Sequence, residues 1–354
     1  MHDWRSHLGE AVTGCAAELR FAEPMSKHTT FRIGGLADAW VSVRDRNTLA
    51  RVLEGCRETG VRTWLLGRGS NVLVSDQGLR GIVICLGGEL AEIKEQRTQG
   101  IQDSRGPVSD TRVLESSTPR ILSAGAGAAL DAVATFAEKE GLAGAEFLAG
   151  IPGTVGGGLH SNAGAFGRSL GDIVISVTVL DHDGNESVLS DAQIRREYRK
   201  PMVDDSRIVL EVTMQLPSGC RMSNGERRVS PEEIRKQRWS KHPTEPSAGS
   251  FFRNPEKDGE RIPAGKLIEQ CGLKGRSIGG ARVSEKHANF LVNTGKARFA
   301  DVYELAQIVK ATVEEQTGIL LEEEVQYLPG PNEARIQNAE ARIQKFRSGA
   351  ANGR

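Results

Sequence analysis

The feature of this 354-residue chain with the clearest chemical meaning is a glycine-rich run at positions 150–171. Five of the nine residues from 150 to 158 are glycine, and each costs about 0.5–1 kcal/mol relative to alanine when its backbone is ordered. Ile151, Pro152 and Val155 are apolar or rigid, which disfavours a flexible linker. The run therefore predicts an ordered loop whose bare backbone supports a flat, extended cofactor.

A second glycine motif, Gly67-Arg68-Gly69-Ser70-Asn71, lies between two apolar segments. Glycines allow positive φ angles and let successive backbone N–H groups converge on an anion, and Ser70 and Asn71 add side-chain donors. Neither the dinucleotide fingerprint G-x-G-x-x-G nor a P-loop occurs in the chain. A phosphate-binding loop and a plain tight turn between strands both remain open at this point.

Two side chains have the right type and setting for proton transfer. Ser250 follows Gly249 and precedes two phenylalanines, so it is either a proton donor at an enclosed site or a turn serine before core residues. Strand alternation over 319–328 places Glu324 on the face of Leu320 and Leu328, where apolar neighbours would raise a carboxyl pKa, but a charged edge strand is the better explanation from the residues alone. For both residues, the residue pattern alone favours the structural explanation.

Periodicity outlines the elements that carry these residues. Asp45 caps a helix with apolar residues at Leu49, Val52 and Cys56, and Gly60 ends it. A second helix spans about 128–140, a third begins at Pro263, and a longer one, centred on 302–313, ends at Gly318. Strands are predicted at residues 61–66, 72–74, 81–86, 174–180, 208–216 and 319–328.

The length and a composition shift near 217–224 suggest several domains. We expect a cofactor domain at 20–217, which includes a polar excursion at 94–120, a substrate domain at 218–328, and a polar tail at 329–354.

Charge and cysteine content exclude several classes of protein. Lys and Arg number 46, as do Asp and Glu, so the basic excess typical of a nucleic-acid binder is missing. The five cysteines are scattered and the seven histidines do not cluster, so we expect reduced thiols and no bound metal. No apolar segment of signal-peptide or membrane-spanning length occurs, and we expect a cytoplasmic location with no membrane partner.

Taken in order, these motifs resemble the UDP-N-acetylenolpyruvoylglucosamine reductase family of flavoenzymes. The resemblance runs from about residue 28 to 325 and includes Tyr198-Arg199 and the segments at 28–35, 67–71, 150–167, 249–255 and 284–290. It implies an α+β chain with an FAD-binding fold of the vanillyl-alcohol-oxidase (PCMH) type in two subdomains, followed by a C-terminal α+β substrate domain. The chain is most similar to the shorter subtype, which lacks a tyrosine-bearing loop.

The resemblance also implies roles for individual residues. The catalytic group would be Ser250, Glu324 and Arg199, although Lys200-Pro201 follows Arg199 where relatives often carry a serine. Substrate would contact Lys241, Asn254 and His287. Non-covalent FAD would be held by Thr30, Phe31, Arg32, Gly34, Gly67, Arg68, Gly69, Ser70, Asn71, Gly125, Ile151, Pro152, Gly153, Val155, Gly156, Gly157, Asn162, Gly164 and Ala165.

The implied reaction is the NADPH-dependent reduction of a UDP-linked enolpyruvyl sugar to UDP-N-acetylmuramate. Hydride would pass through FAD to the vinyl carbon C3, Arg199 would hold the resulting enolate, and Ser250 would protonate C2. The partners would be the nucleotide sugar and NADPH, without nucleic acid, and a monomer is favoured. Alternatives are another FAD oxidoreductase of the same fold and a catalytically silent flavin-binding module.

Overall fold

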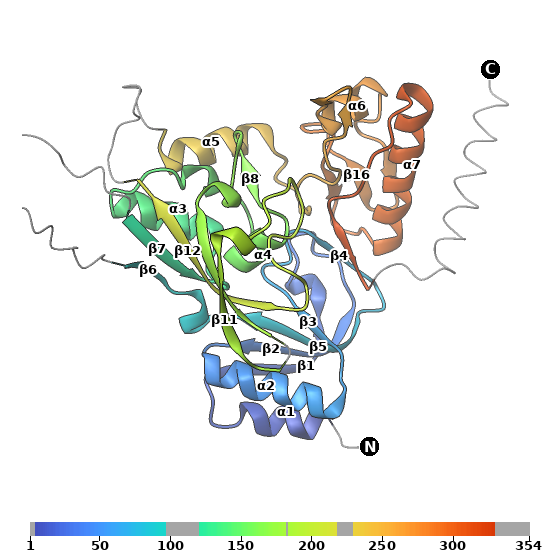
Figure 1. The fold of residues 1–354 in the computed structure, drawn as a ribbon. Helices are drawn as coiled ribbons and strands as arrows, with labels where there is room; N and C mark the ends of the chain where they lie inside the picture. The colour runs from blue at the N-terminus through green and yellow to red at the C-terminus, as the bar shows by residue number, and fades with distance from the viewer. Residues whose placement is uncertain (1–3, 97–119, 182, 218–228, 330–354) are drawn as a thin grey trace, which may run out of the picture.

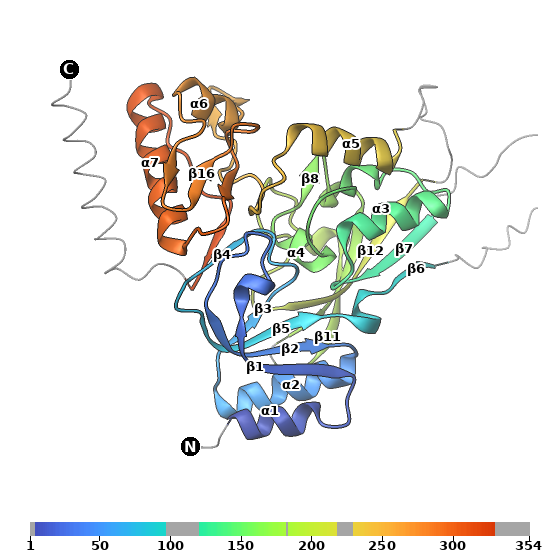
Figure 2. The ribbon, with the colours of Figure 1, turned by 180° about the vertical axis from the view of Figure 1, so that it is seen from behind.

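The computed structural model describes residues 4–96, 120–181, 183–217 and 229–329. Helices and strands are mixed along the chain, which confirms the expected α+β class. Figure 1 and Figure 2 show a sheet at the base, a second sheet above it and a C-terminal unit on one side. The division into domains at 217 and 328 stays a prediction.

The basal sheet is built from the N-terminal part of the chain. Its strand order is β1 (Ala17–Pro24), β2 (Leu36–Val43), β5 (Leu79–Leu86) and β3 (Thr63–Leu65). Strands β2, β5 and β3 run parallel, whereas β1 is antiparallel to β2. Helices α1 (Trp4–Val12) and α2 (Arg46–Thr59) lie below this sheet (Figure 1).

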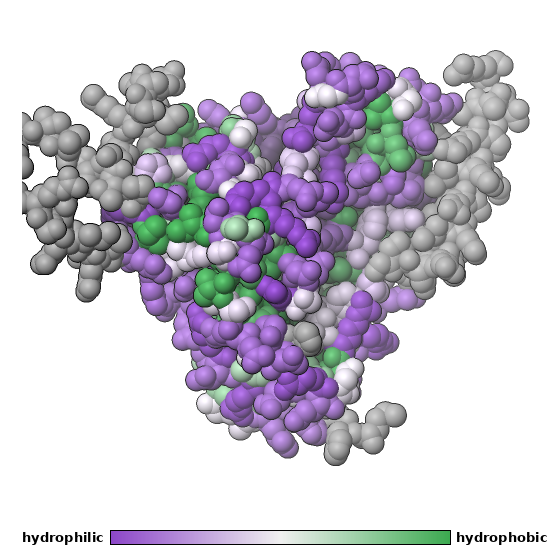
Figure 3. Space-filling model, in the orientation of Figure 1, coloured by the Kyte–Doolittle hydropathy of each residue, from purple (hydrophilic) through white to green (hydrophobic). Residues whose placement is uncertain are grey.

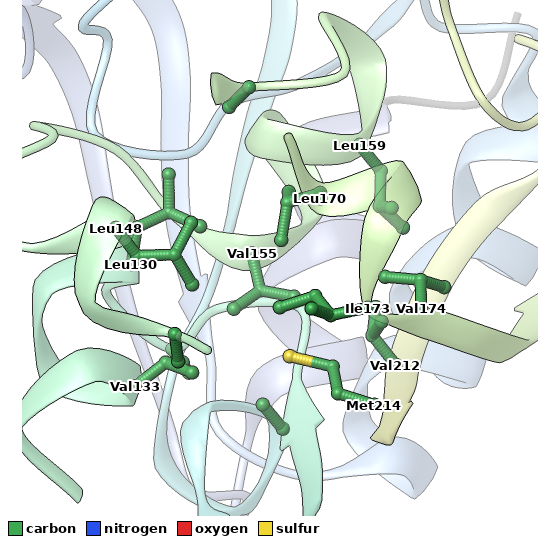
Figure 4. Close-up of a cluster of buried hydrophobic side chains, with 14 of the residues drawn as sticks. Leu130, Val133, Leu148, Val155, Leu159, Leu170, Ile173, Val174, Val212 and Met214 are labelled. Carbon is green, nitrogen blue, oxygen red and sulfur yellow. The ribbon is translucent and has the colours of Figure 1, made fainter. Parts of the chain in front are cut away.

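The second sheet is antiparallel and contains five strands. Its order is β11 (Glu186–Ser190), β10 (Val174–Leu180), β12 (Ile208–Leu216), β7 (Arg120–Gly125) and β6 (Ile93–Gln96). Apolar side chains of α3 (Leu130–Lys139) and α4 (Val155–His160) pack with those of β10 and β12 (Figure 4). Val155 and Leu159 in α4 bury their side chains there, and this burial anchors the glycine-rich run.

The C-terminal unit is built around a core that also takes in Phe31, Ile33 and Leu73 from the N-terminal part. Helices α6 (Ala264–Gln270) and α7 (Phe299–Thr317) pack with the sheet β15 (Ser277–Ile278), β16 (Ala281–Val283) and β17 (Leu291–Asn293). The last strand, β18 (Gln326–Leu328), pairs in parallel with β4 (Val72–Val74) from the N-terminal part. Helix α5 (Pro231–Lys241) packs on α3 and on the 3-10 helix at Glu146–Leu148.

The remaining elements are short. They are the strands β8 (Gly164–Ala165), β9 (Arg168–Ser169), β13 (Glu256–Lys257) and β14 (Glu260–Arg261), and the 3-10 helices Met25–Lys27, Gly88–Ala91, Leu170–Asp172 and Asp191–Gln193.

Most predicted elements are confirmed. The Asp45 carboxylate accepts a hydrogen bond from the Thr48 N–H, and Gly60 ends α2 with a φ of 64°. Strands β10 and β12 have the predicted bounds. The predicted excursion at 94–120 begins and ends inside paired strands, β6 and β7, and its residues 97–119 lie outside the described part of the chain.

Two predictions about local structure were wrong. Residues 319–325 are not in a strand, and only Gln326–Leu328 forms one, because the preceding residues cross the C-terminal core with an isolated bridge from Glu323 to Phe252. The glycine-rich run is not entirely loop, because Thr154 caps the short helix α4 within it. Burial of Val155 and Leu159 outweighs the poor helix propensity of Gly156–Gly158.

Candidate functional site

The two glycine motifs lie against each other, although some 80 residues separate them. A Cβ atom at Gly67 would stand 2.5 Å from the Thr154 Oγ1, and one at Gly153 would stand 3.2 Å from the Ser70 Oγ. Thr154 is the N-cap of α4, so the second motif is fixed by its helix where the first motif meets it. The structure therefore brings together the two stretches from which the sequence predicts a common site.

A third segment joins them at Thr30. The Thr30 backbone N–H donates to the Gly69 carbonyl oxygen at 3.1 Å, and its hydroxyl donates to the Ser247 carbonyl oxygen at 2.8 Å. Gly69 has a φ of 60°, and a Cβ there would stand 2.8 Å from the Thr29 Cα. Residues 28–34, the first glycine motif and the segment that leads to Ser250 thus share one junction.

The glycines of the second motif have two different physical causes. Cβ atoms at Gly156 and Gly158 would press on Ala126 and on Leu170, so internal packing requires glycine at both positions. Gly157 faces only Thr154 Oγ1 at van der Waals distance, which leaves its surface open. The sequence predicts that a cofactor explains these glycines, but internal packing explains Gly156 and Gly158. Backbone open to a ligand is found at Gly157.

Glu324 occupies the centre of the candidate active site. Its Oε1 lies 3.0 Å from the Arg199 Nε, and its backbone N–H donates to the Phe251 carbonyl oxygen at 2.8 Å. Phe251 follows Ser250 directly, so the three separate segments that carry the predicted catalytic residues meet here. Arg199 has a φ of 55°, an uncommon conformation for a residue other than glycine and one that is often found at functional sites.

The electrostatics of Glu324 match the sequence prediction in direction. Burial raises the pKa of its carboxyl, and the positive charges of Arg199 and Arg253 oppose that rise. The sequence predicts that a strand raises this pKa by placing Glu324 among apolar side chains. With no strand at that position, burial beside the Ser250 segment is the cause instead.

The site carries more positive than negative charge. The Nε atoms of Arg199, Arg238 and Arg253 are all buried without a hydrogen-bond partner, since the Arg199 Nε lies within ion-pair distance of Glu324 but not along a hydrogen-bond direction. Burial and the neighbouring Arg199 lower the pKa of Arg238. The guanidinium groups keep other contacts, since Arg238 donates to the Phe147 carbonyl oxygen and Arg253 lies 3.8 Å from Glu322. Three buried Nε–H groups without a partner in the protein nevertheless suit a ligand with several negative charges, such as FAD or a nucleoside-diphosphate sugar.

The predicted substrate residues lie near the end of α5 and in the C-terminal unit. Lys241 is exposed at the last position of α5, and His287 packs edge-on against the neighbouring His242 at 5.8 Å between ring centroids. Burial lowers the pKa of His287 and, with nearby positive charges, lowers that of His242 to about 4. The Asn254 Oδ1 accepts from the Ala264 N–H at 2.9 Å, so that oxygen is engaged by the start of α6.

Several predicted cofactor residues use their side chains within the protein. Phe31 is fully buried in the C-terminal core, which leaves only its backbone for a ligand. The Asn71 amide donates to the Glu324 carbonyl oxygen at 3.0 Å, and the Asn162 amide donates to the carbonyl oxygens of Arg196 and Glu197. Gly125, at the end of β7, is a glycine because a Cβ would overlap the Leu90 carbonyl group.

The other predicted cofactor residues follow the same elements. Arg32 and Gly34 lie between β1 and β2, Arg68 lies in the first glycine motif, and the rest lie within α4 or flank it: Ile151, Pro152, Val155, Gly156, Gly164 and Ala165.

Sequence reasoning missed Arg238, Arg253 and His242. The position of Arg238, one helical turn before His242, could have indicated it from the sequence. Only the packing of α5 on α3, however, directs Arg238 to the site. Within the described residues no group of acidic, histidine and cysteine side chains is arranged to hold a metal ion. None of the described helices is long and apolar enough to cross a membrane.

Comparison with known proteins covers most of the chain. Residues 37–190 match the family model of an FAD-binding domain, and residues 241–328 match that of the C-terminal domain of UDP-N-acetylenolpyruvoylglucosamine reductase. The chain is 41% identical to UDP-N-acetylenolpyruvoylglucosamine reductase 2 of Symbiobacterium thermophilum over 309 residues, 87% of this chain and 91% of that protein. It is 39% identical to the reductase of Moorella thermoacetica over 325 residues, 92% of this chain and 98% of that one.

A solved structure agrees with these relatives. The crystal structure of UDP-N-acetylenolpyruvylglucosamine reductase (MurB) from Thermus caldophilus matches with a TM-score of 0.65 and 31% sequence identity. The match covers 89% of this chain and 99% of that chain.

Proposed function

Because this chain belongs to the family of UDP-N-acetylenolpyruvoylglucosamine reductases, we propose that Ser250, Arg199 and Glu324 carry out its reaction. The fold is the FAD-binding fold of the vanillyl-alcohol-oxidase type joined to the C-terminal domain of this family. The enzyme is an FAD-dependent oxidoreductase that uses NADPH to reduce the enolpyruvyl ether of UDP-N-acetylglucosamine to UDP-N-acetylmuramate, a precursor of peptidoglycan.

The contact of Glu324 with both Arg199 and the Ser250 segment is the observation that supports these roles best. It brings a fixed positive charge and a carboxyl group with a raised pKa against the segment that carries the Ser250 hydroxyl. Packing does not need this combination, since Arg199 keeps a buried Nε without a hydrogen bond. A catalytically silent flavin-binding module has no use for such a set, and we do not favour it.

FAD held at this site would supply hydride transfer: a hydride accepted from NADPH would pass to the vinyl carbon C3 of the substrate. Arg199 then stabilises the negative charge that develops on the substrate carboxylate and its adjoining carbon, because a guanidinium group stays charged at any working pH. Glu324 orients Arg199 through their ion pair. Ser250 donates its hydroxyl proton to C2, which a weak acid can do only when the acceptor is strongly basic.

We assign the FAD site to the junction of the three segments at Thr30, Gly69 and Thr154. Their backbones approach closely there, with the Thr30 N–H bonded to the Gly69 carbonyl oxygen and the Ser70 Oγ beside Gly153. Such a crossing of glycine-rich backbone suits an anion such as the FAD pyrophosphate. Lys241 and His287, with the amide nitrogen of Asn254, would contact the nucleotide-sugar substrate. Arg238 and Arg253, whose Nε atoms are buried without a hydrogen-bond partner, would supply further positive charge there.

We further propose that the enzyme is a cytoplasmic monomer. The four cysteines in the described residues are unpaired thiols, which fits a reducing compartment. A single sharp peak at about the chain mass in size-exclusion chromatography with light scattering would support the monomer, whereas a dimer mass would contradict it.

The test of the site is Ser250→Ala, with the two half-reactions measured separately by stopped-flow absorbance of the flavin. Reduction by NADPH should be preserved, because no proton from Ser250 is needed there. Reoxidation by the enolpyruvyl substrate should slow by about 10²–10⁴-fold, the usual contribution of a positioned acid. Equal slowing of both half-reactions would contradict the role of Ser250.

Ser247→Ala is the matched control. Ser247 lies three residues earlier in the same segment. Its contact with Thr30 uses the backbone carbonyl oxygen, and its hydroxyl makes only a long contact of 3.5 Å with the Gly249 N–H. This variant should keep both half-reactions.

A further inference from the structure

The motif at residues 284–290 contains a side chain that the reaction does not use directly. Asn289 is only 3% exposed, and all its polar side-chain atoms are engaged by one neighbouring residue. Its Oδ1 accepts from the Phe252 N–H at 3.0 Å, and its Nδ2 donates to the Phe252 carbonyl oxygen at 2.8 Å. The side chain therefore pairs with the backbone of Phe252 as a neighbouring β-strand does.

The backbone of Asn289 extends the same pairing. Its carbonyl oxygen accepts from the Phe251 N–H at 2.7 Å, while the Phe251 carbonyl oxygen accepts from the Glu324 N–H on the opposite side. Every backbone polar group of Phe251 and Phe252 is thus satisfied, three of the four by Asn289. Both phenyl rings are fully buried and pack edge to face, so these two residues form a rigid base.

The residue directly before Ser250 has less support. Gly249 has a φ of 79°, and a Cβ placed there would meet no atom within 4 Å. Its N–H reaches only the Ser247 Oγ, at 3.5 Å. The next anchors on that side are Ala248, which is buried, and the Ser247 carbonyl oxygen, which accepts from Thr30, so the direct support of Ser250 comes from the Phe251–Phe252 base that Asn289 holds.

We infer that Asn289 is a positioning residue that holds Ser250 at the distance required for proton delivery to the substrate. This inference rests on the proposed role of Ser250 and adds a residue to it. A proton donor displaced by about 1 Å loses on the order of 10²-fold in rate, so a clamp on the two residues that follow Ser250 matters for the protonation step.

Asn289 also contacts His287, which is a proposed substrate-binding residue. The Asn289 N–H donates to the His287 Nδ1 at 3.3 Å, so that nitrogen carries no proton and the Nε2 carries it instead. Burial lowers the pKa of His287, which keeps the ring neutral. His287 can therefore offer the Nε2 proton to substrate from the loop that positions Ser250.

The experiment compares Asn289→Ala with Ser250→Ala in the flavin-loaded enzyme. Reoxidation of reduced flavin by the enolpyruvyl substrate should slow by about 10²-fold in Asn289→Ala, and reduction by NADPH should be preserved. The solvent deuterium isotope effect on reoxidation should rise in both variants, since proton delivery becomes limiting. Flavin affinity, measured by fluorescence titration of the apoprotein, should stay close to that of the wild type.

Asn293→Ala is the control for the loss of a buried amide. Asn293 is 5% exposed, and its side chain bonds to the Phe31 carbonyl oxygen and to the N–H groups of Gly295 and Ala297, none of which belongs to residues 249–252. Because Phe31 is a proposed FAD contact, this control is read by its isotope effect at saturating FAD and not by its flavin affinity. It should lower the thermal midpoint about as much as Asn289→Ala does, without raising the isotope effect. An isotope effect that rises equally in both variants would overturn the inference.

The outcomes also separate this inference from the proposed function. If Ser250→Ala slows reoxidation and Asn289→Ala does not, only the positioning role fails. If Ser250→Ala leaves reoxidation intact, the proposed function fails first. Should Asn289→Ala not fold, hydrogen exchange of the wild-type Phe251 and Phe252 amides decides: protection like that of the core supports the clamp, and fast exchange overturns it.

Discussion

At the scale of single residues, Glu324 shows how burial and charge compete. Burial favours the neutral carboxyl, whereas Arg199 and Arg253 favour the carboxylate, and burial has the larger effect on the pKa. The folded protein therefore holds the Glu324 proton more tightly than the unfolded chain does. Ionising this residue costs folding free energy, and the cost appears as pH rises through the folded pKa.

Glu324→Gln should remove that pH dependence. Below the ordinary glutamate pKa of 4.5 the carboxyl is protonated in both states, and the variant and wild type should have similar thermal midpoints. As pH rises above that value, the midpoint of the wild type should fall relative to that of Glu324→Gln. The measurement is a series of thermal melts of the substrate-free enzyme between about pH 4 and pH 8, the range that brackets a raised carboxyl pKa.

Glu322→Gln is the control for that series, because it removes the same charge from a side chain that is 72% exposed. A difference between Glu324→Gln and wild type that stays constant with pH, or that equals the Glu322→Gln difference throughout, would contradict a raised pKa for Glu324.

At the scale of elements, the first glycine motif depends on a backbone crossing. Gly69 has a φ of 60°, and its missing side chain is what lets the chain pass the carbonyl group of His28. The same crossing aligns the Gly69 carbonyl oxygen with the Thr30 N–H. The motif is therefore a close-packed junction rather than a simple turn between β3 and β4.

Gly69→Ala should separate the segments at this junction and weaken FAD binding by at least tenfold, which corresponds to about 1.4 kcal/mol. Gly60→Ala is the matched control, because Gly60 has a φ of 64° but no atom within 4 Å of a Cβ placed there. In that variant an alanine adopts the left-handed backbone conformation, which lowers the free energy of unfolding by about 1 kcal/mol without affecting the site. Equal FAD affinity of the two variants by fluorescence titration would contradict the junction.

At the scale of the whole molecule, the N-terminal and C-terminal parts close around the site. Strand β18 adds to β4, the Asn71 amide bonds to the Glu324 carbonyl oxygen, and the Thr30 hydroxyl bonds to the Ser247 carbonyl oxygen. Hydrophilic residues dominate the face in Figure 3, and hydrophobic residues interrupt it only in small groups. The contacts between the two parts combine polar bonds near the site with a shared apolar core, in which Phe31, Ile33 and Leu73 pack among C-terminal residues.

Thr30→Val should weaken the contact between the N-terminal and C-terminal parts with little change in side-chain volume. The loss of the Thr30–Ser247 hydrogen bond should cost about 1 kcal/mol of unfolding free energy and weaken FAD binding. Thr59→Val is the control, because the Thr59 hydroxyl bonds to the Gly55 carbonyl oxygen within α2 alone. Chemical denaturation with and without FAD measures both effects, and a flavin affinity unchanged in Thr30→Val would contradict the closure.

The sequence predicted elements well where short-range signals agree. Asp45, the apolar positions from Leu49 to Cys56, and Gly60 all specify one helix, and α2 forms there. The prediction failed at 319–328, where an alternating pattern resembled a strand but only its last three residues pair. Pairing requires a partner strand, and β4 offers one only to Gln326–Leu328.

By itself, the sequence determined the class of elements, the glycine positions and the side chains able to do chemistry, because propensity, capping and motif spacing are local properties. It also placed the chain in its family through motifs in collinear order. Only the tertiary structure decided that Arg238 and Arg253 converge with Arg199 near Glu324, and that Asn289 clamps the residues after Ser250. Those contacts join segments tens of residues apart, and their geometry follows from how separate cores pack, which no local pattern encodes.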